Sequence, residues 1–233
     1  MTELITLAKQ YEIELTPPMA EQFATYQRLL LCWNERMNLT AITQPREVLE
    51  KHFLDSLIPL AAWGLLPGAR VIDVGTGAGF PGIPMKIARP DIELTLLDSQ
   101  LKRTEFLREL SRELGQENRI IHGRAEEAAH DPALRESFCA ATARAVAALP
   151  VLCELCLGFL RPGGVFFAMK GPDSVKEAES AREAAAILGG GEIKSCAYAL
   201  PSFGERIIYL VEKASQTPAK YPRKHKQMTK APL

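Results

Sequence analysis

A glycine-rich turn directly after a short apolar run is the feature that most constrains this chain. The run reads Val-Ile-Asp-Val-Gly-Thr-Gly-Ala-Gly over residues 71–79. In open α/β folds the turn after the first strand lies at the carboxyl edge of the sheet, where ligands bind. Glycine lets the backbone pass close to a nucleotide because no Cβ intervenes. The turn therefore predicts a strand, a loop and a nucleotide-type ligand.

Two cofactors compete for this loop. Residues 77–82 also spell G-x-G-x-x-G, the dinucleotide fingerprint, in which a helix N-terminus receives a pyrophosphate. Pro81 and Pro84 remove backbone donors that a pyrophosphate would use, and Asp73 would repel phosphates. S-adenosylmethionine carries no phosphate, and its sulfonium and α-amino groups suit a carboxylate. The sequence therefore favours S-adenosylmethionine, with Asp73, Gly75 and Gly77 at its site.

Two later positions also fit a nucleoside. Asp98 ends the second apolar run, roughly 20 residues past the glycines, where an acid accepts the hydrogen bonds of a ribose diol. Asp98 or Ser99 could equally cap the following helix. The polar turn at 123–127 follows the third apolar run and would face an adenine, although a solvated loop explains it as well.

Apolar runs alternate with amphipathic stretches from residue 67 onward. Strands are expected at 70–74, 93–97, 120–121, 140–143 and 165–169, and helices at 83–88, 101–114, 149–160 and 174–188. This alternation predicts a doubly wound, mostly parallel α/β sheet. Two last strands, 194–200 and 206–211, are joined by a short turn and predict an antiparallel hairpin. By analogy, a seven-stranded sheet with that ending is the class I methyltransferase fold.

Three regions follow from this pattern. Residues 1–66 read as a helical appendage, with helices at 19–33 and 47–60, that packs on the core because it is small for a separate domain. Residues 67–213 are expected to form the methyltransferase domain. Residues 214–233 form a basic tail without acids, which either meets RNA phosphates or is a disordered end.

Composition excludes several classes of protein. The formal net charge is +0, and no secretory signal or membrane-spanning run is present, so a cytoplasmic protein without membrane contact is expected. The 5 cysteines are odd in number and scattered, which argues against disulfides. Cys153 and Cys156 spell C-x-x-C but lack a second ligand pair, so we interpret them as buried helix residues and expect no metal.

The loop after the fourth strand narrows the chemistry. It lacks the Asn/Asp-Pro-Pro-aromatic motif of amino-methylating enzymes, and Cys139 lacks the context of a pyrimidine C5 nucleophile. A target that is already nucleophilic remains, such as guanine N7, which needs in-line placement but no base. Arg144 could read guanine O6, hold the cofactor carboxylate, or form a salt bridge between elements.

Nearly the whole chain resembles the bacterial glucose-inhibited division protein B family of small-subunit ribosomal RNA guanine-N7 methyltransferases. The matching motifs are Trp33-Asn34, residues 37–40, residues 52–56, residues 73–84, residues 97–99, Lys102-Arg103, Arg144-Ala145, Lys170-Gly171 and residues 221–224. The resemblance implies S-adenosylmethionine contacts at Gly75, Phe80, Ala125, Glu126 and Arg144. The family often has leucine at Phe80, and its tail usually has glycine and proline where Lys226 and Met228 stand.

The resemblance also implies small-subunit ribosomal RNA as the partner, bare or in the assembled subunit, and indicates no protein partner. Basic residues would contact its phosphates, and the candidates are Lys102, Arg103, Lys170, Arg223 and Lys224. For Lys102 and Arg103 a solvated helix face is the alternative. Two other functions stay open: a nicotinamide-dependent oxidoreductase, for which no Tyr-x-x-x-Lys pair is found, and a non-catalytic RNA-binding module on the same fold.

Overall fold

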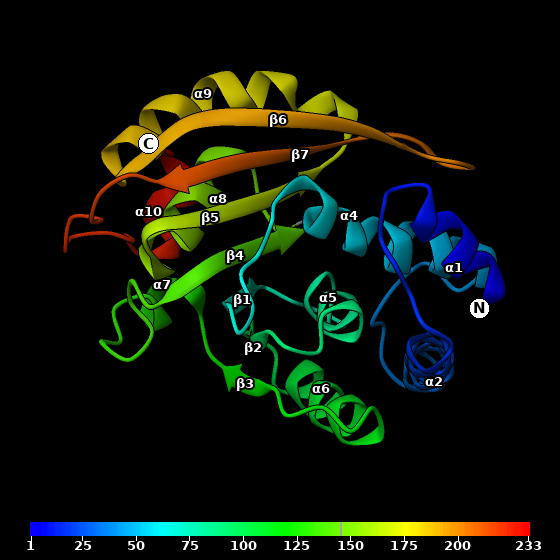
Figure 1. Cartoon of the computed structure of the whole chain (residues 1–233). Helices are drawn as coiled ribbons and strands as arrows, with labels where there is room; N and C mark the ends of the chain where they lie inside the picture. Colours follow the sequence, from blue (N-terminus) through cyan, green and yellow to red (C-terminus); the bar gives the residue numbers. More distant parts are fainter. Residues whose placement is uncertain (145) are drawn as a thin grey trace.

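The computed structural model describes residues 1–144 and 146–233, and its centre is a seven-stranded sheet with the order β3-β2-β1-β4-β5-β7-β6 (Figure 1). The strands are β1 (Arg70–Val74), β2 (Glu93–Asp98), β3 (Arg119–His122), β4 (Phe138–Arg144), β5 (Leu160–Lys170), β6 (Gly190–Leu200) and β7 (Gly204–Lys213). Neighbouring strands from β3 to β5 are parallel, whereas β7 runs antiparallel to β5 and β6. The predicted doubly wound sheet with a terminal hairpin is confirmed.

Helices cover both faces of the sheet, because each inner strand presents apolar side chains to both. In β5, Phe167 and Met169 join one hydrophobic cluster while Phe166 and Ala168 join the other. The first face carries α5 (Gly82–Ala88) and α6 (Leu101–Glu113). The second carries α7 (Ala125–Ala128), α8 (Leu149–Cys156), α9 (Val175–Ile187) and α10 (His225–Lys230), with 3₁₀ turns η2 (Leu157–Phe159) and η3 (Pro172–Ser174).

Two element boundaries in the C-terminal half of the chain differ from the sequence prediction. The helix expected to reach residue 160 ends at Cys156, and β5 begins at Leu160, so the segment 161–164 belongs to the strand rather than to a loop before it. Cys153 and Cys156 are free and buried inside α8, which confirms their interpretation as helix residues.

The N-terminal region consists of α1 (Thr2–Lys9), α2 (Pro17–Asn34), α3 (Pro45–Glu47), the π-helix η1 (Val48–Leu54) and α4 (Asp55–Ala62). The expected single helix at 47–60 is wrong in form, because seven of its residues adopt the wider π geometry, and α1 was not expected at all. Phe23, Tyr26 and Phe53 belong to the same hydrophobic cluster as Ile83 of α5. The N-terminal helices therefore share the core of one sheet face.

The tail is packed against the amino ends of β4 and β5, so its alternative interpretation as a disordered end is wrong. Arg135 donates to the main-chain oxygens of Thr217 and Tyr221, and Met228 of α10 is buried. Figure 1 shows α10 and the C-terminus at one end of the sheet, and the N-terminal helices at the end toward which β4 points. Among the helices in the described residues, none is long and apolar enough to cross a membrane.

Candidate active site

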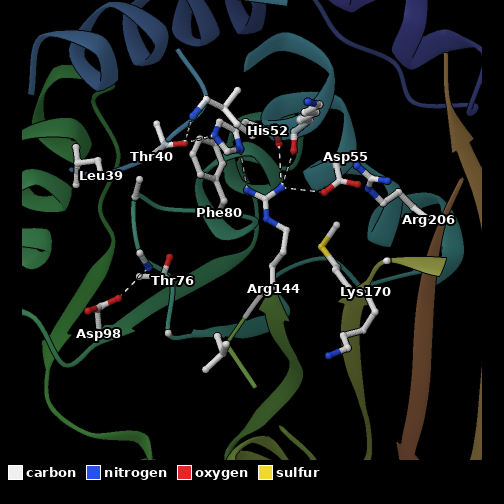
Figure 2. Close-up of a pocket in the computed structure, with 18 of the residues that line it drawn as sticks. Leu39, Thr40, His52, Asp55, Thr76, Phe80, Asp98, Arg144, Lys170 and Arg206 are labelled. Atoms are coloured by element: carbon white, nitrogen blue, oxygen red, sulfur yellow. Dashed lines mark hydrogen bonds and ion pairs between the residues drawn. The ribbon is translucent and has the colours of Figure 1, made fainter. Parts of the chain in front are cut away.

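A cleft of about 760 Å³ lies at the carboxyl edge of the sheet (Figure 2). Its walls come from three sources: the loops after β1 and β2, the ends of β4 and β5 with the β6–β7 hairpin, and the N-terminal region, through the segment after α2 and through η1 and α4. Residues from these three walls include Gly75, Gly77, Phe80 and Asp98; Arg144, Met169, Lys170, Tyr198 and Arg206; and Thr40, Lys51, His52 and Asp55.

The glycine-rich loop packs between the end of β2 and the loop after β4. The amides of Gly75 and Thr76 both donate to the main-chain oxygen of Leu97 at the end of β2. Gly75 has a φ of +69°, and a Cβ built on it would lie 2.8 Å from a methyl carbon of Val146, in the loop after β4. Glycine suits this position, because other residues rarely adopt this backbone conformation and a Cβ would force the Val146 side chain to move.

Asp98 lines the cleft where β2 ends, as the sequence predicts for an acid next to a ribose. Its carboxylate accepts hydrogen bonds from the amides of Gly77 (2.9 Å) and Gln100 (2.8 Å) and lies 3.5 Å from Arg103. A carboxylate offers about four acceptor positions. One residue thus ties the glycine-rich loop to the start of α6 and keeps acceptor capacity for a ligand.

Asp73 lies beneath the loop rather than in the cleft, which corrects the expectation that it meets the cationic end of the cofactor. It is fully buried and accepts hydrogen bonds from the Thr76 hydroxyl, the Gly82 amide and the Thr142 hydroxyl. Burial raises the pKa of its carboxyl from 3.8 to about 6, against these hydrogen bonds, which lower it. Asp73 therefore fixes the loop to β4 and to the start of α5.

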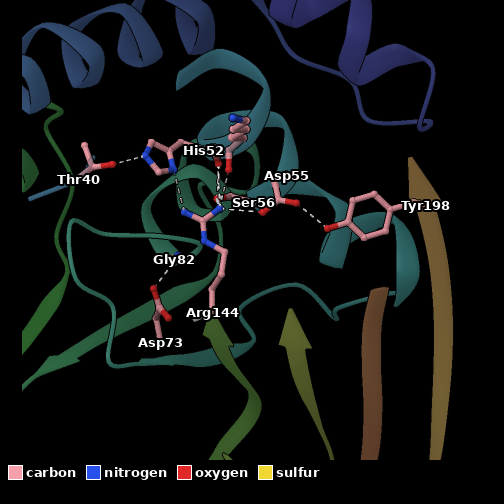
Figure 3. A network of polar contacts seen from close by, with 9 residues as sticks. Thr40, His52, Asp55, Ser56, Asp73, Gly82, Arg144 and Tyr198 are labelled. Atoms are coloured by element: carbon pink, nitrogen blue, oxygen red, sulfur yellow. Dashed lines mark hydrogen bonds and ion pairs between the residues drawn. The ribbon is translucent and has the colours of Figure 1, made fainter. Parts of the chain in front are cut away.

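Arg144, the last residue of β4, points into the N-terminal helices. Its Nη1 lies 2.9 Å from Oδ2 of Asp55, and the Asp55 Oδ1 accepts a hydrogen bond of 2.7 Å from the Tyr198 hydroxyl (Figure 3). The guanidinium carbon lies 4.9 Å from the centre of the Phe80 ring. Of the three roles considered for Arg144, the salt bridge between elements is present, and the side chain also lines the cleft.

His52 completes this cluster as a neutral ring. It stacks on Phe80 with ring centroids 4.4 Å apart and planes 15° apart. Burial and the nearby charge of Arg144 lower the pKa of His52 from 6.5 to about 3. Because arginine only donates, its Nη2 contact at 3.3 Å makes Nδ1 of His52 an acceptor. The ring proton is then on Nε2, which donates to the Thr40 hydroxyl at 2.8 Å.

The predicted site residues fall into three groups by their place relative to the cleft. Gly75, Gly77, Phe80, Asp98, Arg103, Arg144 and Lys170 line the cleft, whereas Ala125 and Glu126 lie in α7, after β3, outside the residues that line it. Lys102 is exposed on α6, and Lys224 is exposed in the tail. Lys170 is engaged within the protein, 2.7 Å from Glu177 and 2.9 Å from the Ala147 oxygen.

The structure gives Arg223 a different role from the RNA contact expected of it. Its guanidinium lies 2.7 Å from the carboxylate of Glu154 in α8, which is 1% exposed. This pair holds the tail at the edge of the sheet opposite the cleft. Arg223 and Lys224 therefore lie far from the loops that would hold a cofactor.

Sequence reasoning missed the contribution of the N-terminal helices to the cleft. Thr40, Lys51, His52 and Asp55 all line it, as does Arg206 of β7. The motifs at 37–40 and 52–56 carry part of the family resemblance, and their polar residues next to apolar helices are the sign in the sequence that points to a site.

Comparison with known proteins identifies relatives over nearly the whole chain. Residues 19–199 match the GidB family, described as rRNA small subunit methyltransferase G. A Ribosomal RNA small subunit methyltransferase G from Alkaliphilus metalliredigens is 48% identical over 91% of this chain and 90% of its own. The protein of the same name from Lactococcus lactis subsp. cremoris strain SK11 is 44% identical over 99% and 98%.

Solved structures with low sequence identity share the fold. A methyltransferase from Pyrococcus furiosus has a TM-score of 0.59 at 16% identity, covering 82% of this chain and all of its own. An O-methyltransferase from Bacillus cereus, solved in complex with SAH, has a TM-score of 0.57 at 16% identity, covering 81% and 91%. With the glycine-rich loop, Asp98 and the N-terminal wall in place, and with these matches along its length, the chain belongs to the GidB family.

Proposed function

We propose that this chain is a cytoplasmic enzyme that transfers the methyl group of S-adenosylmethionine to N7 of a guanine in small-subunit ribosomal RNA. The observation that carries the proposal is the continuity of one cleft from the glycine-rich loop and Asp98 to Arg144, Met169 and Tyr198. The part of the cleft at the glycine-rich loop and Asp98 suits a nucleoside. The part at Arg144, Met169 and Tyr198 leaves room for a target base beside it. The names of the curated relatives support the RNA substrate.

The loop fits S-adenosylmethionine better than a dinucleotide. The amide of Gly82, the first residue of α5, donates to the Asp73 carboxylate at 2.9 Å, and Pro84 has no amide hydrogen to offer. The Ile83 amide donates to the Gly79 oxygen, so the amides at this helix start are already bonded or missing and are not free for a pyrophosphate. This geometry disfavours the nicotinamide-dependent oxidoreductase, and the O-methyltransferase of the same fold that was solved with SAH supports the methyl donor.

The site also fits a reaction without a base. When bound, S-adenosylmethionine supplies an activated methyl group. The N7 lone pair of guanine forms the new bond to the methyl carbon as the carbon–sulfur bond breaks, and the positive charge passes from sulfur to the purine. No proton leaves N7, so the protein has to align the reactants and exclude water. His52 fits a positioning part, because its Nδ1 already accepts from Arg144.

The test is methyl transfer from labelled S-adenosylmethionine to small-subunit ribosomal RNA, offered bare and as subunits from cells that lack this enzyme. We expect label recovered as 7-methylguanosine on at least one substrate, with an Asp98→Ala variant as the inactive control. Label on another base or atom would overturn the N7 assignment. Binding of both ligands without any label would support a non-catalytic RNA-binding module instead.

A further inference from the structure

Arg144 is surrounded by acceptors from the N-terminal helices (Figure 3). Its Nη1 lies 2.9 Å from Asp55 Oδ2, 3.1 Å from the Lys51 oxygen and 3.2 Å from the Ser56 hydroxyl, and its Nη2 lies 3.3 Å from His52 Nδ1. These acceptors come from the π-helix η1 and the first turn of α4. The N-terminal region therefore determines where the guanidinium points.

Arg144 keeps part of its hydrogen-bonding capacity for a ligand. A guanidinium has five N–H hydrogens: two on each Nη and one on Nε. The Nη1 hydrogens are taken by the cluster around Asp55, and His52 accepts one Nη2 hydrogen. Within residues 1–144 and 146–233, no acceptor bonds the Nε hydrogen or the second Nη2 hydrogen. Two donors thus remain on a side chain that lines the cleft.

Each partner of Arg144 is itself held by a second contact. The Tyr198 hydroxyl fixes the other oxygen of Asp55, and the Thr40 hydroxyl fixes the far nitrogen of His52. The Phe80 ring lies against both the His52 ring and the guanidinium. A long side chain that is held in this way has already lost much of its rotamer entropy in the free protein. Binding of a ligand therefore costs less conformational entropy.

We propose that Asp55 and His52 are positioning residues, which hold Arg144 so that its two remaining donors meet an oxygen acceptor of the reactants. The inference rests on the proposed function. The acceptor is an oxygen of the reacting pair, either the cofactor carboxylate or O6 of the target guanine. Both present an oxygen to a planar pair of donors, and the experiments below separate them.

The main test is Asp55→Asn, which keeps the shape of the side chain and removes its charge. We expect either the cofactor affinity or kcat/KM for RNA to fall roughly tenfold, because Arg144 would be misplaced. A tenfold weaker S-adenosylhomocysteine affinity by calorimetry would place the cofactor carboxylate at Arg144. A tenfold lower kcat/KM for RNA with unchanged cofactor affinity would place guanine O6 there. A folded variant in which both quantities change less than twofold would overturn the proposal.

Two substitutions of His52 provide a matched pair. His52→Asn keeps an acceptor near the position of Nδ1, whereas His52→Gln keeps a group near Nε2 and removes the acceptor for Arg144. Both lose the stacking on Phe80 equally. We expect His52→Gln to lose activity about tenfold more than His52→Asn, and equal losses would contradict the positioning role.

Glu154→Gln is the control for a purely structural effect. It removes a buried carboxylate paired with arginine at the opposite edge of the sheet, so it should lower stability and leave kcat and both affinities unchanged. A double-mutant cycle tests the route of the effect: in an Arg144→Lys background, Asp55→Asn should add less than a twofold loss, because Asp55 acts through Arg144. Additive losses would overturn the proposal.

One readout needs no RNA and stands apart from the proposed function. In ¹⁵N-labelled wild-type protein, His52 should show the neutral, Nε2-protonated ring, and Asp55→Asn should shift its Nδ1 resonance as Arg144 moves. An unchanged resonance would contradict the positioning role even if methylation were found. Absence of methylation by the wild type, with the Nδ1 shift observed, would instead discard only the proposed function.

Discussion

The Tyr26 hydroxyl in α2 donates a hydrogen bond to the main-chain oxygen of Ala78 in the glycine-rich loop. Tyr26 is fully buried and stacks on Phe80 with ring centroids 5.1 Å apart. A Cβ built on Gly79 would lie 2.8 Å from the same hydroxyl, so glycine is needed where helix and loop meet. The N-terminal helices thus shape the loop that would hold the cofactor as well as the orientation of Arg144.

Tyr26→Phe should weaken both stability and cofactor affinity. It leaves the Ala78 oxygen buried without its partner, which costs about 1–3 kcal/mol of unfolding free energy. Denaturation in urea and calorimetry with S-adenosylhomocysteine measure the two effects. Tyr11→Phe is the control, since it deletes a hydroxyl that bonds Ala199 on β6, away from the loop. Equal cofactor affinities for the two variants would show that the Tyr26 bond does not shape the loop.

Asp98→Asn should reduce cofactor affinity and also lower stability, because an amide has only one oxygen for the two backbone amides, of Gly77 and Gln100, that the carboxylate accepts. The amide keeps an acceptor for the Gly77 amide, but it loses the charge-assisted hydrogen bonds to a ribose, each worth about 1.5–3 kcal/mol. We expect the dissociation constant of S-adenosylhomocysteine to rise roughly 10- to 100-fold. Asp91→Asn, at an ion pair with Arg89 outside the cleft, should leave it unchanged. If Asp98→Asn bound S-adenosylhomocysteine as tightly as the wild type, Asp98 would not be a cofactor contact.

Asp73 should give the protein a distinctive pH dependence. Its pKa rises from 3.8 to about 6 on folding, so the folded state binds more protons between these pH values. The stability contribution of Asp73 is therefore lost as pH rises through that window, by on the order of 3 kcal/mol. The unfolding free energy of wild type minus that of Asp73→Asn should fall between pH 4 and pH 6.5. A difference that is flat or rises with pH would contradict this assignment.

Arg223→Ala should destabilise the protein without changing RNA binding. The substitution leaves Glu154, 1% exposed, without its partner, which costs about 3 kcal/mol. Because the pair lies opposite the cleft, the slope of RNA affinity against salt should stay constant, whereas loss of a phosphate contact would reduce it by about 1. Lys224→Ala, at the exposed neighbour, should leave stability unchanged. A reduced slope for Arg223→Ala would show that Arg223 does contact RNA phosphates.

Local pattern in the sequence determined most of the fold and one half of the site. The glycine-rich turn, Asp98 and the terminal hairpin follow from strand ends, turn residues and alternating apolar runs, which are properties of short segments. The same locality explains the errors: no short-range pattern distinguishes the π-helix η1 from an α-helix, and Asp73 reads as a ligand contact until its burial is known.

The other half of the site was decided only by the tertiary structure. Asp55 and Arg144 are 89 positions apart, Asp55 and Tyr198 are 143 apart, and Glu154 and Arg223 are 69 apart. Which charges pair depends on how the N-terminal helices and the tail pack on the sheet. The burial of apolar surface that drives this packing is non-directional, so it leaves no periodic trace in the polar residues that it brings together.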